Sequence, residues 1–339
     1  MNKENVRSIL ANMVMSRTIS QSLSVAAKLD IADLLGEGVL NIYEISKLTS
    51  TNISFLYRMM RLLANFDIFD ELPSKNFKNN DISSLLRTDH PNSFKLMAIW
   101  LGEKPIWQSI NQLQECLKTG KSGFELQNAY PLYDYLENNN SLNDLFHTIM
   151  RQKTRLIGNT IVKNYTFNKF KSIVDIGGGQ GELMVKILST HTDIAGAIFD
   201  LPLVTQQTMS LIKNLGLEDR CQCIPGDFFK IIPDNYDLYI LMNVLHNWDN
   251  KNCIRLLKNC SKNIHRTDQR IIIIENIIDN SVKNNFNLIR DLEMMLITTG
   301  GKERTLEEFN ELFKSSNLKL INAHANNSGY SILELCSSS

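Results

Sequence analysis

The sequence predicts an α/β fold, in which a doubly wound and mostly parallel sheet of seven strands follows a domain made almost entirely of helices. From about residue 170 onward, short apolar runs alternate with amphipathic segments, as in a sheet covered by helices on both faces. Before about residue 160, apolar residues instead recur at helical spacing. We therefore expect two domains, residues 1–160 and 161–339.

The first domain contains a pattern typical of a winged helix. One amphipathic helix begins near Val25, two more cover residues 41–50 and 53–66, and a short strand at 68–72 follows. Such units often bind DNA, so a DNA-binding regulator is one hypothesis. The last of these helices, however, offers mainly apolar side chains beside its arginines, which favours burial against another subunit over contact with phosphates. We expect a dimerisation module.

The second domain supplies the sheet. We expect strands at residues 172–176, 195–200, 220–224, 236–242, 270–276, 318–323 and 330–335, with helices between the first six. The last two strands lie so close in the sequence that they must pair as a hairpin. This pairing predicts one antiparallel strand, at the edge of the sheet.

A glycine-rich turn follows the first of these strands, in the run I-V-D-I-G-G-G-Q-G from Ile173 to Gly181. Glycines let the backbone turn tightly and approach a ligand, and the next helix points its positive end toward that ligand. Asp200 ends the second strand, where a carboxylate can accept hydrogen bonds from a ribose. The spacing is shorter than the dinucleotide fingerprint. It suits S-adenosylmethionine, which lacks phosphates and whose ammonium can meet carbonyls around Gly177 and a nearby carboxylate; a purely structural turn is the alternative.

The composition excludes several classes of protein. Lys and Arg together equal Asp and Glu together, at 36 each, so no overall charge attracts nucleic acid or an anionic membrane. No apolar run approaches the ~20 residues of a spanning helix, and the N-terminus lacks the apolar centre of a signal peptide. Six scattered cysteines show no metal-ligand spacing. We expect a cytoplasmic protein without disulfide, structural zinc, nucleic-acid partner or membrane partner.

Three polar residues are expected at the carboxyl edge of the sheet, where open α/β sheets bind their ligands. His246 follows the fourth strand, and Asp249 after it caps an amphipathic helix. Glu275 ends the apolar run of the fifth strand, where burying a carboxylate without a partner would cost free energy. Glu303 precedes a helix that starts with the capping box Thr305 to Glu308. These groups are candidates for acid–base chemistry.

Taken together, these motifs resemble the class I S-adenosylmethionine-dependent O-methyltransferases of the caffeate, hydroxyindole and bacterial secondary-metabolite type. The resemblance extends over nearly the whole chain. It is carried by V-D-I-G-G-G-Q-G at 174–181, F-D-L-P at 199–202, G-D-F-F at 226–229, L-H-N-W-D at 245–249, and D-L-E-M-M-L with G-G-K-E-R-T between 291 and 305. It implies a Rossmann-like catalytic domain and an N-terminal winged-helix-like dimerisation domain.

The resemblance also implies a role for each matching residue. The cofactor-binding residues would be Asp175, Gly177, Gly179, Asp200, Leu201, Gly226, Asp227, Phe228 and Met242. The catalytic residues would be His246 as general base, framed by Glu275 and Glu303. The acceptor pocket would be lined by Phe146, Met150, Asn247, Trp248, Asp291 and Met295. The implied reaction is methyl transfer from S-adenosylmethionine to a phenolic or enolic hydroxyl of a small aromatic or polyketide-like metabolite, without a metal, in a homodimer formed through the N-terminal helices.

Several alternatives stay open. Asn247 replaces the aspartate that usually follows the catalytic histidine, and Met242 replaces a basic residue of some plant members. Phe146 and Met150, one helical turn apart, also fit a plain core, and Glu303 also fits a surface charge at a helix start. Other enzyme hypotheses keep the cofactor but methylate nitrogen, or catalyse a non-methylating reaction such as hydroxylation or pericyclic rearrangement.

Overall fold

The computed structural model describes residues 3–283, 285–325 and 329–338, and the chain divides into two compact units. Unit 1 comprises Met1–Gln108 and Asp144–Ile149, and unit 2 comprises Ser109–Asn143 and Met150–Ser339. The domain boundary that we expected near residue 160 differs from the places where these units divide, after residues 108, 143 and 149. Residues 109–143 belong with the sheet because α8 (Leu113–Thr119) and α9 (Gly123–Asn128) pack against α15 (Phe286–Ile297).

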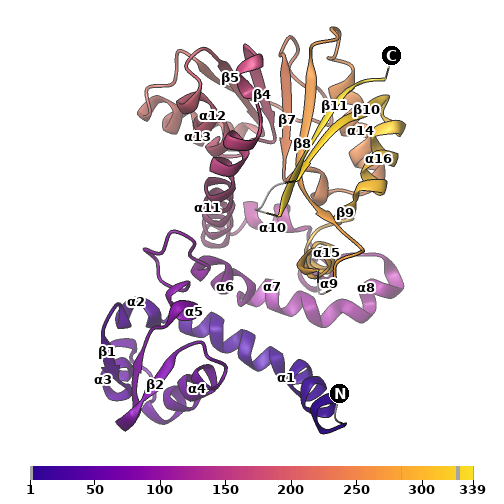
Figure 1. Ribbon diagram of the computed structural model, residues 1–339. Coiled ribbons are helices and arrows are strands. Elements are labelled where there is room, and N and C mark those ends of the chain that lie inside the picture. Colours follow the sequence, from indigo (N-terminus) through magenta and orange to yellow (C-terminus); the bar gives the residue numbers. More distant parts are fainter. Residues whose placement is uncertain (1–2, 284, 326–328, 339) are drawn as a thin grey trace. The chain divides into compact units, whose positions relative to one another are not determined.

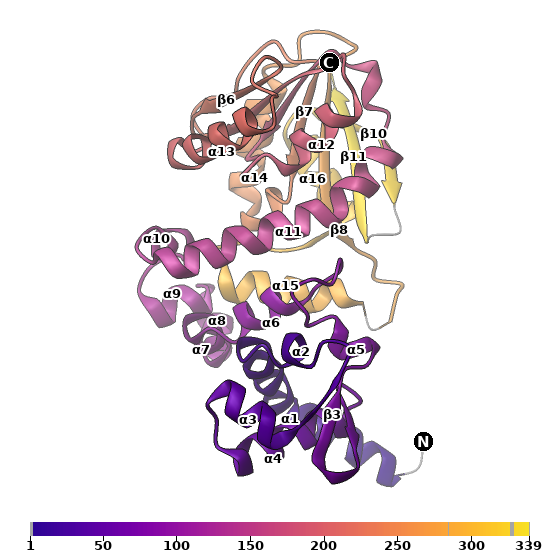
Figure 2. The ribbon, with the colours of Figure 1, turned by 90° about the vertical axis from the view of Figure 1, so that its left-hand side faces the viewer.

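Unit 1 combines helices with a small antiparallel sheet (Figure 2). Its helices are α1 (Lys3–Lys28), α2 (Ile31–Leu35), α3 (Ile42–Thr49), α4 (Ile53–Asn65), α5 (Asp81–Ser84), α6 (Lys95–Leu101) and the start of α7 (Lys104–Ser109). Its strands β1 (Val39–Asn41), β2 (Asp70–Leu72) and β3 (Asn76–Lys78) lie in the order β1-β3-β2. Asn41 caps α3 in a capping box with Glu44, and Asn52 caps α4. Two capped helices followed by a hairpin form the winged-helix pattern.

The apolar face of α4 is used differently from our expectation. Leu56, Met60 and Leu63 are at most 4% exposed and belong to the core of unit 1, so they are not available to another subunit. Phe55 remains 69% exposed, and the Arg58 guanidinium lies 5.9 Å from the centre of its ring. A period-3.6 pattern indicates a buried face, but it does not say what buries that face.

The main sheet of unit 2 has the strand order β10-β11-β8-β7-β4-β5-β6 (Figure 1). Its strands are β4 (Ser172–Ile176), β5 (Ala195–Asp200), β6 (Cys221–Pro225), β7 (Leu238–Met242), β8 (Arg270–Ile278), β10 (Leu318–Ala325) and β11 (Tyr330–Ser337), while the short β9 (Arg304–Thr305) pairs with β8. The expected antiparallel hairpin is present, but our expectation that its antiparallel strand forms the edge was wrong. β11 pairs with both β8 and β10, so the edge strand is β10. Ile332 and Leu333 are fully buried on opposite faces of β11, as an interior strand requires.

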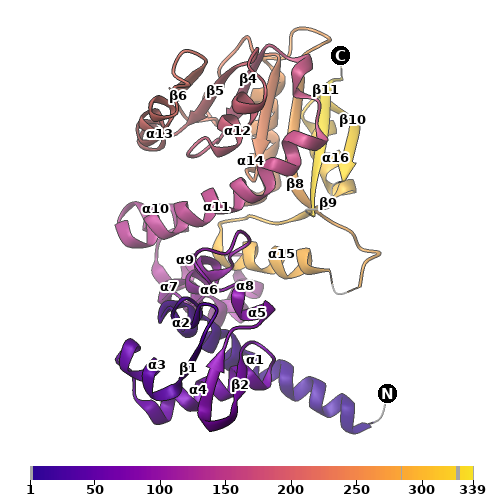
Figure 3. The ribbon, with the colours of Figure 1, turned by 60° about the vertical axis from the view of Figure 1, so that its left-hand side comes forward.

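Helices cover both faces of this sheet (Figure 3). On one face the core contains residues of α11 (Asn140–Asn164), α12 (Glu182–Thr190) and α13 (Pro202–Asn214). On the other it contains residues of α14 (Asn250–Ser261) and α16 (Leu306–Ser315). The helix α10 (Leu132–Glu137) completes unit 2. Within the described ranges, no helix has both the length and the apolar character needed to cross a bilayer.

One expected helix is missing. Residues 226–237, between β6 and β7, form a loop without helix, although we expected a helix between every pair of the first six strands. The loop is held by side-chain amides of α14: Asn259 donates to the Phe228 carbonyl at 3.0 Å, and Asn263 donates to the Ile232 carbonyl at 3.0 Å. These distant contacts replace the backbone bonds that a helix would have supplied.

Candidate functional site

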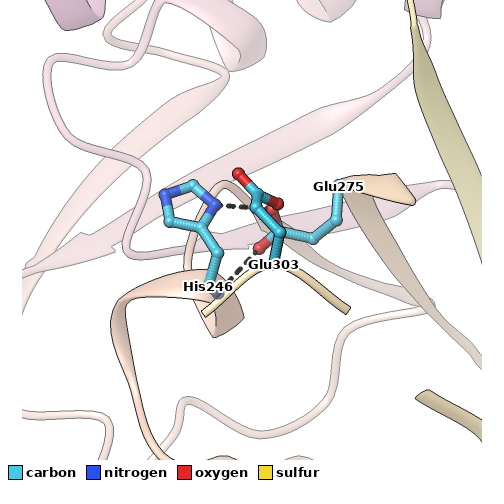
Figure 4. Close-up of side chains that lie close together, drawn as sticks. All are labelled: His246, Glu275 and Glu303. Atoms are coloured by element: carbon cyan, nitrogen blue, oxygen red, sulfur yellow. Dashed lines mark hydrogen bonds and ion pairs between the residues drawn. The ribbon is translucent and has the colours of Figure 1, made fainter. Parts of the chain in front are cut away.

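His246, Glu275 and Glu303 come together in unit 2, near the carboxyl ends of β7 and β8 (Figure 4). His246 lies in a single 3₁₀ turn, Leu245–Asn247, after β7; Glu275 belongs to β8; and Glu303 directly precedes β9. One ring nitrogen of His246 and one oxygen from each carboxylate all lie within 4.8 Å of one another. The three residues are 8%, 0% and 2% exposed, so their charges interact in a poorly solvated environment.

Glu275 fixes the orientation of the His246 ring. Its Oε2 lies 2.7 Å from Nδ1 of His246, and its Oε1 accepts the backbone N–H of His246 at 3.3 Å. Burial opposes ionisation of Glu275, but the charge and hydrogen bonds of His246 outweigh it and hold the pKa of Glu275 below its usual value. An ionised Glu275 accepts a hydrogen bond from Nδ1–H, which leaves Nε2 of neutral His246 as a lone-pair acceptor. Among the described residues, nothing is hydrogen-bonded to Nε2.

Arg304, which sequence reasoning missed, ties the His246 turn to the segment that carries Glu303. Its guanidinium is fully buried and donates to the Leu245 carbonyl at 3.0 Å, the Trp248 carbonyl at 2.7 Å and the Asn250 side chain at 3.0 Å. The backbone N–H of Lys302 also donates to the His246 carbonyl at 2.9 Å. His246 and Glu303 are therefore held by one set of shared contacts.

The glycine turn after β4 is shaped by Asp200. The N–H of Gly179 donates to Oδ2 of Asp200 at 2.8 Å, and the N–H of Leu201 donates to Oδ1 at 2.7 Å. Gly177 and Gly179 have φ values of +71° and +56°, a conformation that side chains rarely adopt. A Cβ at Gly179 would meet no atom within 4 Å, so open space adjoins this turn, whereas a Cβ at Gly177 would lie 3.0 Å from Val244.

Asp175 supplies a buried acceptor beside this turn. It is 2% exposed, and its Oδ1 has no hydrogen-bond partner within the part of the chain that the structure describes. Burial, and next the negative charge of Asp200, raise the pKa of Asp175 to about 7. A buried carboxylate without a donor costs free energy unless a cation or donor arrives. The ammonium group of S-adenosylmethionine is such a cation, so the residues fit this cofactor.

Replacing Asp175 with asparagine should stabilise the ligand-free protein and weaken cofactor binding. Because the folded-state pKa lies above the ordinary aspartate pKa of 3.8, the stability that protonation provides is complete below pH 3.8 and is lost as the pH rises through about 7. At about pH 8 we expect the free energy of unfolding of the Asp175→Asn variant to be about 1–3 kcal/mol higher than that of the parent chain. Urea denaturation at low and high pH, with S-adenosylmethionine titrated by calorimetry, checks both effects. A variant that is less stable than the parent at pH 8 would contradict this account.

The segment expected to hold adenine follows β6. The N–H of Gly226 donates to the Asp200 carbonyl at 2.9 Å, and Oδ1 of Asp227 accepts the N–H of Phe229 at 2.9 Å. The ring centres of Phe228 and Phe229 lie 6.2 and 4.8 Å from that of Trp248. Trp248, which we expected in the acceptor pocket, is thus packed with this segment.

The other predicted acceptor residues are dispersed. Oδ1 of Asp291 accepts the backbone N–H of Glu303 at 2.9 Å, so Asp291 supports a catalytic candidate. The Asn247 amide donates to the Asn243 carbonyl at 3.1 Å. Phe146 belongs to unit 1, where its ring centre lies 5.4 Å from that of Trp100. Met150 and Met295 are half-buried in unit 2.

Two predicted cofactor residues, Met242 and Leu201, differ in exposure. Tyr133, which was not predicted from the sequence, also lies near the expected cofactor site. Met242 ends β7 and is only 8% exposed within the core, whereas Leu201 is 50% exposed. Tyr133 of α10 lies near Asp200: burial of its hydroxyl, and next the charge of Asp200, raise the pKa of Tyr133 to about 12, although part of its ring is exposed. No pattern around Tyr133 connects it with a strand end that lies far away in the sequence.

Comparison with known proteins gives two family matches along the chain. Residues 110–318 match the O-methyltransferase domain, and residues 12–89 match the O-methyltransferase dimerisation domain. The chain is 32% identical over 327 residues to the phenazine O-methyltransferase PhzM of Lysobacter antibioticus, covering 96% of this chain and 95% of that protein. It is 26% identical over 315 residues to an 8-amino-8-demethylriboflavin N,N-dimethyltransferase of Streptomyces davaonensis, covering 92% and 90%.

A solved structure extends the similarity to the fold. The O-methyltransferase NcsB1 of neocarzinostatin biosynthesis, in complex with S-adenosylmethionine and 2-hydroxy-5-methyl naphthoic acid, superposes with a TM-score of 0.82 at 25% identity, covering 94% of this chain and 96% of that one. The turn geometry, the orphaned Asp175 oxygen and the His246–Glu275 pair agree with such a fold. The chain therefore belongs to the S-adenosylmethionine-dependent O-methyltransferase family and is an enzyme of that family.

Proposed function

We propose that this enzyme methylates a phenolic or enolic hydroxyl of a small aromatic or polyketide-like secondary metabolite, with His246 as the general base. The observation that carries the proposal is the 2.7 Å contact between Nδ1 of His246 and Oε2 of Glu275. It gives the imidazole the tautomer in which Nε2 takes up a proton. Two relatives support an aromatic acceptor: one is a phenazine O-methyltransferase, and the structure of NcsB1 contains a bound naphthoic acid.

The cofactor is assigned to the turn after β4 and the ends of β5 and β6. Asp175 would meet the ammonium, Gly177 and Gly179 the methionine part, Asp200 with Leu201 the ribose, and the Gly226–Phe228 segment, with Met242, the adenine. S-adenosylmethionine, when bound, supplies an electrophilic methyl group. The open space beside Gly179 and the unpartnered Oδ1 of Asp175 support this assignment.

His246 lowers the cost of making the nucleophile. A phenol has a pKa of ~10 and imidazole of ~6.5, so unaided proton transfer is uphill by roughly 5 kcal/mol. The Glu275 carboxylate on Nδ1 stabilises the imidazolium that forms when Nε2 accepts the proton, and burial strengthens this effect. The phenolate can then attack in a site from which water is largely excluded.

We propose that no metal takes part. The spacing of His246, Glu275 and Glu303 is compatible with a metal site. However, the nitrogen that faces Glu275 is occupied by the Nδ1–H hydrogen bond to Oε2, so its lone pair is not available to an ion held by the carboxylates. The ionised state of Glu275 supports the hydrogen-bonded arrangement.

A matched set of acceptors tests the proposal. The full-length enzyme is incubated with methyl-labelled S-adenosylmethionine and 1-hydroxyphenazine or 2-naphthol, and separately with the corresponding amines. We expect label in the methyl ethers, because Nε2 of His246 can deprotonate a hydroxyl, whereas a neutral aromatic amine needs no base before it attacks. Mass spectrometry identifies the labelled product. Label in the amines alone would favour the nitrogen-methylating alternative, which the riboflavin-related relative makes worth testing, and label in neither set would refute the acceptor class.

We also propose that two copies of the chain assemble through their N-terminal helices. The match to a dimerisation domain supports this assembly. Exposed apolar side chains along α1 also support this assembly, because a helix that remains in solvent rarely exposes so many of them. The residues concerned, each at least 40% exposed in the single chain, are Val6, Ile9, Leu10, Met13, Val14 and Met15.

A further inference from the structure

The carboxylate of Glu303 is buried without hydrogen bonds from the described residues, and the proposed proton transfer does not explain why. Glu303 is 2% exposed, yet neither Oε1 nor Oε2 accepts a hydrogen bond from any described residue. Glu275 differs, because both of its oxygens are engaged by His246. A carboxylate offers about four lone-pair sites, and burying them without donors costs free energy. Such a group is satisfied only when a donor comes from outside the chain.

The surroundings of Glu303 hold it in place without using these oxygens. Its backbone N–H donates to Oδ1 of Asp291 at 2.9 Å. Nη2 of Arg290 lies 3.2 Å from Oε1, close enough for an ion pair but outside hydrogen-bond geometry. Arg290 donates its hydrogen bonds to Asn276 instead. In the Asn276 amide orientation that satisfies both the oxygen and the nitrogen, the amide oxygen lies 2.9 Å from Nη1 and 3.1 Å from Nη2 of Arg290. Arg290 thus gives its charge to Glu303 and its hydrogen bonds to Asn276.

Nearby positive charges partly offset the effect of burial on Glu303. Burial raises the pKa of Glu303 above its usual value. The positive charges of His246 and Arg290 oppose that rise only in part, the charge of Glu275 adds to it, and Lys153 opposes it more weakly. Lys153 lies in α11, where its ammonium is 5.8 Å from the ring centre of Tyr330. With His246 neutral, Arg290 and Lys153 are the two described cations beside the carboxylates of Glu275 and Glu303. In its ionised form Glu303 can only accept hydrogen bonds.

The position of Glu303 beside the His246 ring limits what can contact both residues. An oxygen of Glu303 lies within 4.8 Å of one nitrogen of this ring, both carboxylates face its Nδ1 side, and Nε2 is separated from Nδ1 by a single ring carbon (Figure 4). Two donors that each make a hydrogen bond of about 2.8 Å can serve both acceptors when they sit on neighbouring atoms of one ring. Two donors on opposite sides of a fused ring system are too far apart to do so.

We propose that Glu303 is a recognition residue for a second donor, so that the acceptor carries an O–H or N–H group adjacent to the hydroxyl that is methylated. The inference rests on the proposed function, because it assumes that the reacting hydroxyl is placed at His246. It narrows the acceptor class to ortho-dihydroxy or ortho-amino-hydroxy aromatics and their enolic counterparts. Arg290 is a positioning residue in this arrangement, since it acts on the acceptor only through Glu303.

Three naphthols test the proposal on the whole enzyme. They are 2,3-dihydroxynaphthalene with adjacent hydroxyls, 2,6-dihydroxynaphthalene with separated hydroxyls, and 2-naphthol with one. We expect the adjacent diol to have about 10–100-fold higher kcat/KM than the other two, since a hydrogen bond to a charged group has this effect. In enzyme loaded with S-adenosylhomocysteine, calorimetry should give the same order of dissociation constants. Equal values for the two diols, or no binding by any of the three, would overturn the inference.

Two variants connect the preference with Glu303. Glu303→Gln should reduce the ratio between the two diols to within a few-fold, whereas the control Glu311→Gln, on the exposed side of α16, should keep it. Arg290→Gln removes the compensating charge, so its diol ratio should be low near neutral pH and recover as the pH rises and Glu303 ionises. A purely structural role for Arg290 would not give this pH-dependent recovery. An unchanged ratio in Glu303→Gln would refute the recognition role.

These measurements separate the inference from the proposed function. If the loaded enzyme binds the adjacent diol best but no acceptor is methylated, the proposed function fails while Glu303 recognition stands as a binding property. If methyl ethers form from all three naphthols at equal kcat/KM, the proposed function stands and the inference fails.

Discussion

Replacement of His246 by glutamine should lower kcat/KM for a phenolic acceptor by about 10²–10⁴-fold, the usual contribution of a positioned general base. Glutamine keeps the approximate size of imidazole and can still hydrogen-bond to Glu275, but it has no lone pair basic enough to take the proton. Cofactor affinity should change little, because the cofactor is assigned to other residues. Steady-state kinetics with S-adenosylmethionine titrations distinguish these effects.

The pH profile makes this prediction more specific. Without a base, the variant depends on acceptor that has already ionised in solution, so its rate should rise with pH toward the phenol pKa of ~10. The deficit relative to the parent enzyme should shrink accordingly. His265→Gln is the matched control: this half-exposed histidine lies 3.4 Å from Asp234, and its loss should leave the profile unchanged. A deficit that stays constant with pH, or no deficit at all, would exclude His246 as the base.

Loss of the buried guanidinium should be the most damaging single change to stability near the site. We expect Arg304→Met to lower the free energy of unfolding by about 3–5 kcal/mol, because the carbonyls of Leu245 and Trp248 would remain buried without donors. The same change should lower kcat, since the turn that carries His246 would lose its attachment to the segment of Glu303. Urea denaturation and kinetics at a temperature where the variant is folded measure the two effects.

An exposed arginine supplies the comparison for Arg304. Arg266 is paired with Asp237 and Asp268 on the surface, where ion pairs contribute little, so Arg266→Met should change stability far less and leave kcat intact. Equal losses in the two variants would show that the buried contacts of Arg304 carry no special weight. A folded Arg304→Met enzyme with full kcat would show that the His246 turn keeps its geometry without this residue.

The parts of the fold that sequence reasoning predicted well are those decided by local patterns. β4 and β5 were expected at the residues where they occur, because a buried parallel strand is a short, continuous apolar run bounded by turn residues. The capping box at Thr305 was also visible in the sequence, since it involves residues three apart. The interior position of β11 was not, because hairpin pairing fixes a strand's partner but not which strand of the pair joins the sheet.

The candidate site divides in the same way. Its three titratable residues were predictable from their positions at strand ends and before a capped helix, and the structure brings them together. The supporting contacts of Arg290, Arg304 and Asp291 were not predictable, because each depends on segments whose relative placement only the folded chain determines. The packing of Trp248 against Phe229 likewise depends on a loop where a helix had been expected.

The interior position of β11 also matters during synthesis of the chain. Glu275 stands opposite Ser331 across the pairing of β8 and β11, so the strand that carries this carboxylate obtains its last neighbour only when β11 has been translated. Until then, the growing polypeptide presents an open row of peptide groups on a very apolar strand, which can pair with other nascent chains on the same messenger.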